Sequence, residues 1–113
     1  MVPDNDEPVV QEMTLGSVFA ALADQHRRRV ILALLAEPEG TERHCSSFEL
    51  PVSKATLTHH FRVLRRAGLL HQVNRGNSNM AQLRRSDLRQ RFPALLELLQ
   101  AEIEGRPGPG DEP

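Results

Sequence analysis

The sequence is poor in aromatic residues and has only one cysteine. Aromatic side chains make up 4 % of the 113 residues, and all of them are Phe. Binding single-stranded nucleic acid by base stacking needs several exposed rings, so this mode of binding is not expected. The single cysteine, Cys45, excludes an intrachain disulfide and fits a reducing compartment.

Long apolar runs are also missing. The longest extends from Val30 to Ala36, far short of the roughly 20 residues that a membrane span needs. The first residues are acidic and lack the basic start of a secretory signal. We therefore expect a cytoplasmic protein without a membrane partner. The length suits one domain with one modest core and is too short for a large multilayer enzyme.

Acidic and basic residues nearly balance overall, with 15 Asp and Glu against 14 Lys and Arg, but they are unevenly distributed. Between Arg43 and Arg91, ten basic residues face only Glu49 and Asp87. Such a block is typical of a phosphate-binding surface, although a solvated arginine-rich face has the same composition. For Arg27–Arg29 we expect a solvated basic edge, with phosphate contact as the alternative.

Composition also divides the chain into three parts. Residues 1–12 are acidic, contain two prolines and have no basic residue, so we expect a disordered tail. Residues 105–113 are rich in Gly and Pro and are expected to be disordered as well. The folded domain is then 13–104.

Apolar spacing and capping residues predict helices in the first half of this domain. The first helix begins at an N-cap, Thr14, and ends near Ala23. The second begins at the N-cap Asp24 and ends before Glu37–Gly40, where Pro and Gly interrupt it. A short third helix is expected over 45–50.

A helix and a hairpin are predicted next. Ser53 is a favourable N-cap and Gly68 a favourable stop, which predicts a helix over 54–67. Extended segments at 69–74 and 81–84 flank a turn rich in Gly and Asn, as in a β-hairpin. The fold class is therefore mainly α with a two-stranded β wing, a winged helix-turn-helix.

A helical wheel separates two faces of the helix at 54–67. Leu57, Phe61 and Leu64 form the core face, and His60 lies close to it as a structural histidine. The opposite, outer face carries small, polar and cationic side chains, flanked by Lys54 and Arg65. Its residues are Ala55, Thr58, His59, Arg62 and Arg66. Such groups suit base edges and phosphates in a major groove, although a solvated helix face looks similar.

Three segments carry a family resemblance. SKATLTHHFRVLRRAGLL, residues 53–70, resembles the recognition-helix segment of ArsR-type winged-helix repressors. LADQHRRRVILALLAE and RSDLRQRFPALLELL resemble the second and last helices of that family, so the resemblance covers about 15–103. It implies a homodimer paired through the first and last helices. It also implies recognition helices in successive major grooves, wings at the flanking backbone, and repression of transcription relieved by an effector.

Double-stranded DNA is the partner that this resemblance implies, with contacts carried over residue by residue. They are Ser53, Lys54, Thr56, Thr58, His59 and Arg62 in the recognition helix, and Arg75 and Asn77 in the wing. Arg66 joins them because the wheel places it on the same outer face.

The last helix carries a wider apolar stripe than a small domain needs, and it begins at the cap Ser86. Pro93 either kinks this helix or starts a second one. We expect its surplus apolar surface to pair with the first helix in a homodimer. The interface residues are predicted to be Leu15, Val18, Phe19, Leu95, Leu99 and Ile103.

Other chemistry finds little support. Cys45 beside His44 offers too few ligands for a metal site, and no pattern specifies a cofactor or an effector. Cys45 is a candidate redox switch if a cationic setting lowers its pKa, and a small half-buried side chain otherwise. No phosphate loop or catalytic motif indicates an enzyme. The alternative to DNA binding is a winged helix that acts as a protein-interaction module.

Overall fold

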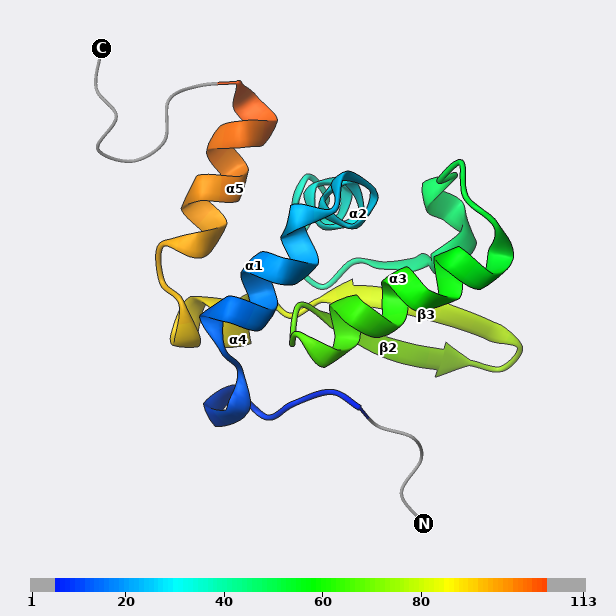
Figure 1. Ribbon diagram of the computed structural model, residues 1–113, viewed down its shortest axis with the longest axis horizontal. Helices are drawn as coiled ribbons and strands as arrows, with labels where there is room; N and C mark the ends of the chain where they lie inside the picture. Colours follow the sequence, from blue (N-terminus) through cyan, green and yellow to red (C-terminus); the bar gives the residue numbers. More distant parts are fainter. Residues whose placement is uncertain (1–5, 106–113) are drawn as a thin grey trace.

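The computed structural model describes residues 6–105, and Figure 1 shows their arrangement. Two short 3₁₀ helices, η1 and η2, accompany the α-helices and strands. In chain order the elements are η1 (Val10–Glu12), α1 (Leu15–Ala23), α2 (Gln25–Leu35), β1 (Glu42–His44), η2 (Cys45–Phe48), α3 (Lys54–Arg66), β2 (Leu70–Arg75), β3 (Ser78–Leu83), α4 (Arg85–Arg91) and α5 (Leu95–Glu104). The predicted mainly helical, winged architecture is confirmed.

The first two helices begin where their capping residues predict. The Thr14 side chain accepts a hydrogen bond from the Ser17 amide, and α1 follows it. The Asp24 carboxylate accepts from the amides of His26 and Arg27, at 2.8 and 3.1 Å, and starts α2. Each cap satisfies amides that have no partner within the helix.

Helix α3 also agrees with its prediction. The Ser53 hydroxyl accepts from the Thr56 amide at the start, and Gly68 follows the C-cap residue Ala67 with φ +89°. A Cβ at Gly68 would lie 2.7 Å from Cγ of Met13. The position therefore requires glycine for its backbone angle and for the close approach of Met13.

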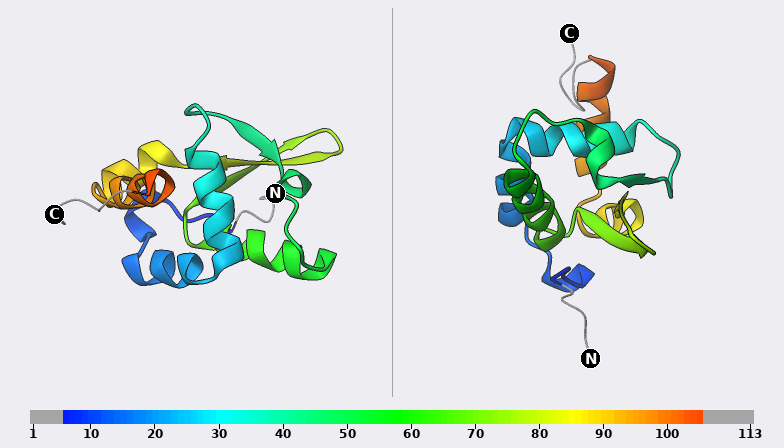
Figure 2. Two further views of the ribbon diagram at one scale, coloured as in Figure 1. Left: turned by 90° about the horizontal axis from the view of Figure 1, so that it is seen from above. Right: turned by 90° about the vertical axis from the view of Figure 1, so that its right-hand side faces the viewer.

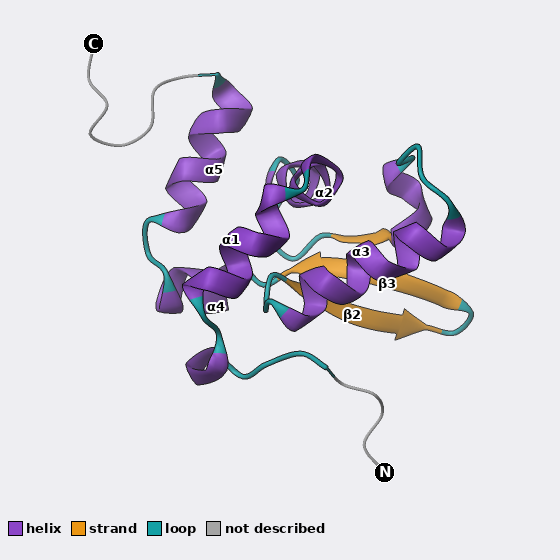
Figure 3. Ribbon diagram, in the orientation of Figure 1, coloured by secondary structure: helices purple, strands orange, loops and turns teal. Residues whose placement is uncertain are grey.

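The sheet has three antiparallel strands in the described residues, whereas only the two strands of the hairpin were predicted. β3 is central, with β2 on one side and β1 on the other. The three residues of β1 have no apolar alternation, so nothing local marks them as a strand, and pairing with β3 creates it. η2 replaces the longer helix expected over 45–50. The β2–β3 hairpin extends beside α3 and forms the wing (Figure 3).

Two expectations about the C-terminal segment are resolved. Pro93 divides it into two helices, α4 and α5. The predicted cap Ser86 is wrong, because α4 already begins at Arg85. The chain leaves β3 with the Arg84 amide bonded to the Leu69 carbonyl and enters the helix directly, so no capping side chain is used.

Residues 6–12, expected to be part of a disordered tail, instead lie along the domain. They include η1, and Figure 2 shows the segment running beside the end of α3. Composition failed here because the partners of these acidic residues are distant in the sequence. Residues 1–5, and 106–113 of the second expected tail, lie outside the described residues.

One hydrophobic core joins the helices to the sheet. Val18, Ile31, Leu34, Leu64 and Leu88 are each at most 1 % exposed. Because α1, α2 and α3 all contribute to this core, it fixes the orientation of α3 and leaves the opposite face of that helix in solvent.

Candidate nucleic-acid interface

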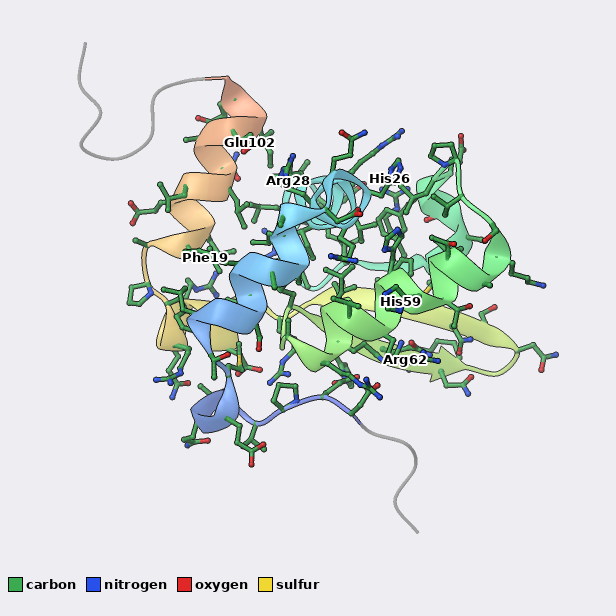
Figure 4. All side chains as sticks on the ribbon, viewed as in Figure 1. Phe19, His26, Arg28, His59, Arg62 and Glu102 are labelled. Atoms are coloured by element: carbon green, nitrogen blue, oxygen red, sulfur yellow. The ribbon has the colours of Figure 1, made fainter. Side chains whose placement is uncertain are left out.

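The outer face of α3 is a solvent-exposed row of polar and cationic side chains. Lys54, Thr58, Arg62 and Arg66 follow one another at four-residue intervals, so they share one side of the helix. Figure 4 shows His59 and Arg62 on this helix, and both are exposed. The core face agrees with the wheel, with Phe61 and Leu64 buried and Leu57 half-buried, so the predicted division into two faces is confirmed.

Several of these outer side chains form no hydrogen bond or ion pair in the described part of the chain. Within residues 6–105, Lys54, His59 and Arg62 make no side-chain hydrogen bond and no ion pair. Ser53 and Thr56 are exposed but bonded to each other, with 3.0 Å between their hydroxyl oxygens at the start of the helix. The N-terminal and middle parts of the outer face are thus available to a ligand.

His60 is a structural residue, as predicted. Its side chain is buried at 5 % exposure, and burial lowers the pKa of its imidazole. Nδ1 lies 3.2 Å from a guanidinium nitrogen of Arg27. Since arginine can only donate, Nδ1 accepts, and the proton of the neutral ring is on Nε2. This bond ties the inner face of α3 to α2.

In the wing, Arg75 and Asn77 are exposed near the tip, but Arg75 is occupied. Its guanidinium donates to both carboxylate oxygens of Glu42 on β1, at 2.7 and 3.1 Å. This pair lowers the pKa of Glu42 and raises that of Arg75. A DNA phosphate at Arg75 therefore has to compete with Glu42. Among residues 6–105, no side chain or backbone group forms a hydrogen bond with the side chain of Asn77.

Many arginines of the basic block predicted from composition are bound by carboxylates or backbone carbonyls within the fold. Arg84 pairs with Asp87 at 2.9 Å, and Arg89 with Glu39 at 2.7 Å. Arg85 donates to the Leu34 carbonyl at 2.8 Å. A count of charges could not show this, because most of these acceptors lie far away in the sequence or on the backbone.

Arg27 and Arg28 have a role that sequence analysis missed. Arg27 donates to the carbonyls of Ala21 and Ala20, and Arg28 donates to that of Leu22 at 2.7 Å. They therefore cap the C-terminal end of α1, where the helix dipole favours positive charge. Arg28 also lies 3.5 Å from Glu102 of α5 (Figure 4). The expected solvated edge is confined to Arg29, which is exposed.

An apolar groove lies between α1 and the start of α5. Leu15, Phe19 and Leu98 are 44, 55 and 50 % exposed, and Phe92 and Pro93 complete an open depression of about 350 Å³. Phe19 lies on the side of α1 that faces α5 (Figure 4). Sequence reasoning missed Leu98, which is half-exposed although Leu95, Leu96 and Leu99 of the same helix are buried.

The residues predicted for the dimer interface divide between this groove and the core. Leu15 and Phe19 line the groove, and Ile103 is 36 % exposed further along α5. Val18 and Leu99 are corrections, because they are 0 and 6 % exposed within the domain core. Leu95 lines the groove but is only 6 % exposed. Most of the apolar stripe packs into the core of the domain, so fewer residues than predicted are exposed for a dimer interface.

Cys45 does not have the setting that a reactive thiolate needs. It is half-buried, packs against the core and lines a small pocket with Thr58 and Asn79. Burial raises its pKa, and the charge of Arg65 only partly offsets this. Of the two alternatives for Cys45, the small half-buried side chain agrees with this setting, in which desolvation outweighs the charge of Arg65.

In the part of the chain that the structure describes, no group of three or more His, Cys, Asp or Glu side chains is placed to hold a metal ion. Between residues 6 and 105, none of the helices has the length and apolar character to cross a membrane.

Solved structures that resemble this chain indicate its family and support its fold. The chain matches an ArsR-like transcriptional regulator from Rhodococcus sp. RHA1 with 31 % identity and a TM-score of 0.54, covering 80 % of this chain and 83 % of that one. It is also similar in fold to an ArsR family transcriptional regulator, with 20 % identity, a TM-score of 0.57, and coverage of 80 % and 96 %. A possible transcriptional regulator for arsenical resistance shares 23 % identity and a TM-score of 0.56, covering 81 % and 84 %. No family model and no curated protein matches the sequence.

Proposed function

Because this chain belongs to the ArsR family of transcriptional regulators, we propose that it binds a specific sequence of double-stranded DNA as a homodimeric repressor. It is a DNA-binding protein and not an enzyme in this proposal, and its effector is unidentified. The observation that carries the proposal is the outer face of α3, where Lys54, His59 and Arg62 are exposed and make no side-chain hydrogen bond or ion pair among residues 6–105.

The N-terminal half of α3 enters the major groove. Thr58 and His59 are short enough to approach base edges, and Ser53, Lys54 and Thr56 lie at the end of the helix that leads into the groove. Arg62, one turn further on, reaches a guanine edge or a phosphate. Arg66 is the last cation of the same row.

The wing supplies flanking contacts. Arg75 and Asn77 lie at the tip of the hairpin, about where a winged helix reaches the neighbouring backbone. Arg75 exchanges Glu42 for a phosphate when DNA is bound. Its contribution is therefore smaller than that of Arg62, which gives up no ion pair within the described residues.

The groove between α1 and α5 is the dimer interface in this proposal. Phe19 and Leu98 are large, apolar and half-exposed, and a second copy related by a two-fold axis would cover them with the same pair. A patch of this kind is rarely left in water by a monomer. Leu15 and Ile103 extend the surface on either side.

The binding test compares a duplex from upstream of the gene with a scrambled duplex by fluorescence anisotropy, at low and high salt. We expect tighter binding to the first duplex, with affinity that falls as salt rises. Arg62→Ala and His59→Ala together should abolish the preference. Arg89→Ala is the matched control, because it removes an exposed arginine of α4 that pairs with Glu39.

Equal weak binding to both duplexes by the wild type would refute sequence-specific recognition. Salt-independent capture of a protein partner, unaffected by Arg62→Ala, would favour the protein-interaction module instead. A thiol-redox regulator has less support, because Cys45 is half-buried and burial raises its pKa.

The dimer has its own test. Phe19→Glu and Leu98→Glu should convert a dimer to a monomer in sedimentation experiments, because each places a charge in the centre of the groove. Val9→Glu is the control, since Val9 is 57 % exposed and outside the groove. A wild-type monomer at micromolar concentration would refute the dimer.

A further inference from the structure

The segment Asp6–Pro8 lies against the end of α3 and the free edge of the sheet (Figure 1). Its acidic side chains contact the most basic part of the recognition helix. None of the functions proposed above uses this contact.

Asp6 binds two adjacent arginines of α3. Its carboxylate oxygens accept from Nε and a terminal nitrogen of Arg65, at 3.1 and 3.3 Å, and one of them lies 3.5 Å from Nε of Arg66. Burial alone would raise the pKa of Asp6, but the hydrogen bond and charge of Arg65, with the charge of Arg66, hold it below its usual value. Two oxygens on one guanidinium fork is the arrangement that arginine also offers to a phosphate.

Contacts of the residues that follow Asp6 hold this part of the chain in place. Glu7 accepts from the backbone amide of Gln72 at 2.9 Å and lies 2.8 Å from Nδ1 of His71, so it covers the outer edge of β2. Arg84 donates to the Pro8 carbonyl at 2.8 Å. A few residues later Met13 is buried against Gly68. The chain thus delivers Asp6 to the two arginines at high effective concentration.

Arg66 belongs to the outer row of α3, and its side chain is 65 % exposed. Arg62 precedes it by one turn on the same side of the helix and is free of partners among residues 6–105. The phosphate backbone beside a bound α3 would therefore meet Arg62 first and then the site that Asp6 fills.

We propose that Arg65 and Arg66 form a binding site for a DNA backbone phosphate, which the chain's own Asp6 occupies in the free protein. This inference rests on the proposed function. It adds that Asp6 competes with the DNA phosphate for Arg65 and Arg66. The acidic segment lowers the affinity for DNA until a phosphate displaces it. Neutralising Asp6 should then strengthen DNA binding, whereas neutralising an acidic residue that does not contact the arginines should not.

The test measures duplex affinity for Asp6→Asn and Glu12→Gln by the same anisotropy assay. Each variant removes one negative charge from residues 6–12, but Glu12 is exposed and does not contact Arg65 or Arg66. We expect Asp6→Asn to bind about fivefold more tightly than the wild type, the order of one exposed ion pair. Glu12→Gln should change affinity by less than about twofold.

A double-mutant cycle identifies the site. In an Arg66→Ala background, the gain from Asp6→Asn should be largely lost, because half of the phosphate site is missing. A gain that persists unchanged would mean that Asp6 acts through the general field of the protein, and it would overturn the proposal. Equal effects of Asp6→Asn and Glu12→Gln would overturn it as well.

The outcomes separate this inference from the function on which it rests. If the wild type prefers its upstream duplex but Asp6→Asn behaves like Glu12→Gln, only the inference fails. If there is no preference but Asp6→Asn alone strengthens low-salt binding to both duplexes, the phosphate site stands and specific recognition fails. Hydrogen exchange at the Gln72 amide, which Glu7 protects, should quicken when DNA displaces the segment. Unchanged exchange in the complex would show that the segment stays in place and would refute displacement.

Discussion

Replacing Gly68 by alanine should destabilise the protein for two separable reasons. Its φ of +89° strains any residue with a Cβ, at a cost of about 1–2 kcal/mol. The new methyl would also lie 2.7 Å from Cγ and 2.9 Å from Cε of Met13, which is only 1 % exposed and has little room to move. Overpacking of this kind costs about 1–3 kcal/mol, so the total loss is about 2–5 kcal/mol.

Gly40 provides the matched control. Its φ of +91° is nearly the same, but nothing lies within 4 Å of a Cβ built on it. Gly40→Ala should therefore lose only the backbone part, about 1–2 kcal/mol. The free energy of unfolding of each variant is measured by urea denaturation at one protein concentration, because a dimer would make stability depend on concentration.

The two results should differ by at least about 1 kcal/mol, the lower bound for overpacking. Equal losses at Gly68 and Gly40 would refute the close approach of Met13. A second check uses Met13→Ala, which removes the obstructing side chain. In that background Gly68→Ala should cost no more than Gly40→Ala does.

The remaining predictions concern titration, capping and thiol chemistry. Burial lowers the pKa of His60, so the unfolded chain binds the extra proton first, and the free energy of unfolding should fall as pH drops below the ordinary value of 6.5. His60→Gln should flatten this dependence in pH-resolved denaturation, and an equal flattening by the exposed His59→Gln would contradict the assignment. Asp24→Ala should cost about 0.5–2 kcal/mol in thermal unfolding through loss of the α2 cap, while Asp24→Asn should cost much less. Cys45 should react with iodoacetamide more slowly than a free thiol at the same pH, and faster reaction would show that burial does not control it.

The recognition helix could be predicted from sequence because its signals are local. Ser53 starts it, Gly68 stops it, and the spacing of Phe61 and Leu64 identifies its buried side. These signals act over one to four residues. At this range, spacing along a helix alone determines which side of the helix a side chain faces.

Features that depend on distant partners could not be predicted. Asp6 and Arg65 are 59 positions apart, and the three residues of β1 become a strand only against β3. The acidic segment looked disordered because its composition cannot bury enough apolar area alone, but it binds arginines that the fold brings to it. Ion pairs with distant arginines hold the acidic segment on the domain, and amino-acid composition cannot reveal such pairs.

The candidate site was predicted in its residue types but not in its pairing. Arg62 and Arg75 are equally basic in sequence, yet only Arg75 carries a carboxylate partner, Glu42. Likewise the dimer surface predicted from sequence included Leu99, which is buried in the core, and omitted Leu98, which is half-exposed. Such assignments need the orientation of the helix, which a continuous stripe does not define.

Arg27 joins three helices at one point. Its guanidinium donates to Ala20 and Ala21 at the end of α1 and to His60 on the inner side of α3, from the first turn of α2. In the proposed dimer, Phe19 of α1 lies at the interface, so the hydrogen bonds of Arg27 connect this interface to α3. The separation of the two recognition helices, and with it the half-site spacing of an operator, is then set by the angle at which α1 docks on its partner. A small rotation of α1 in the groove would change the spacing that the protein accepts, while every side chain that reads the bases stays the same.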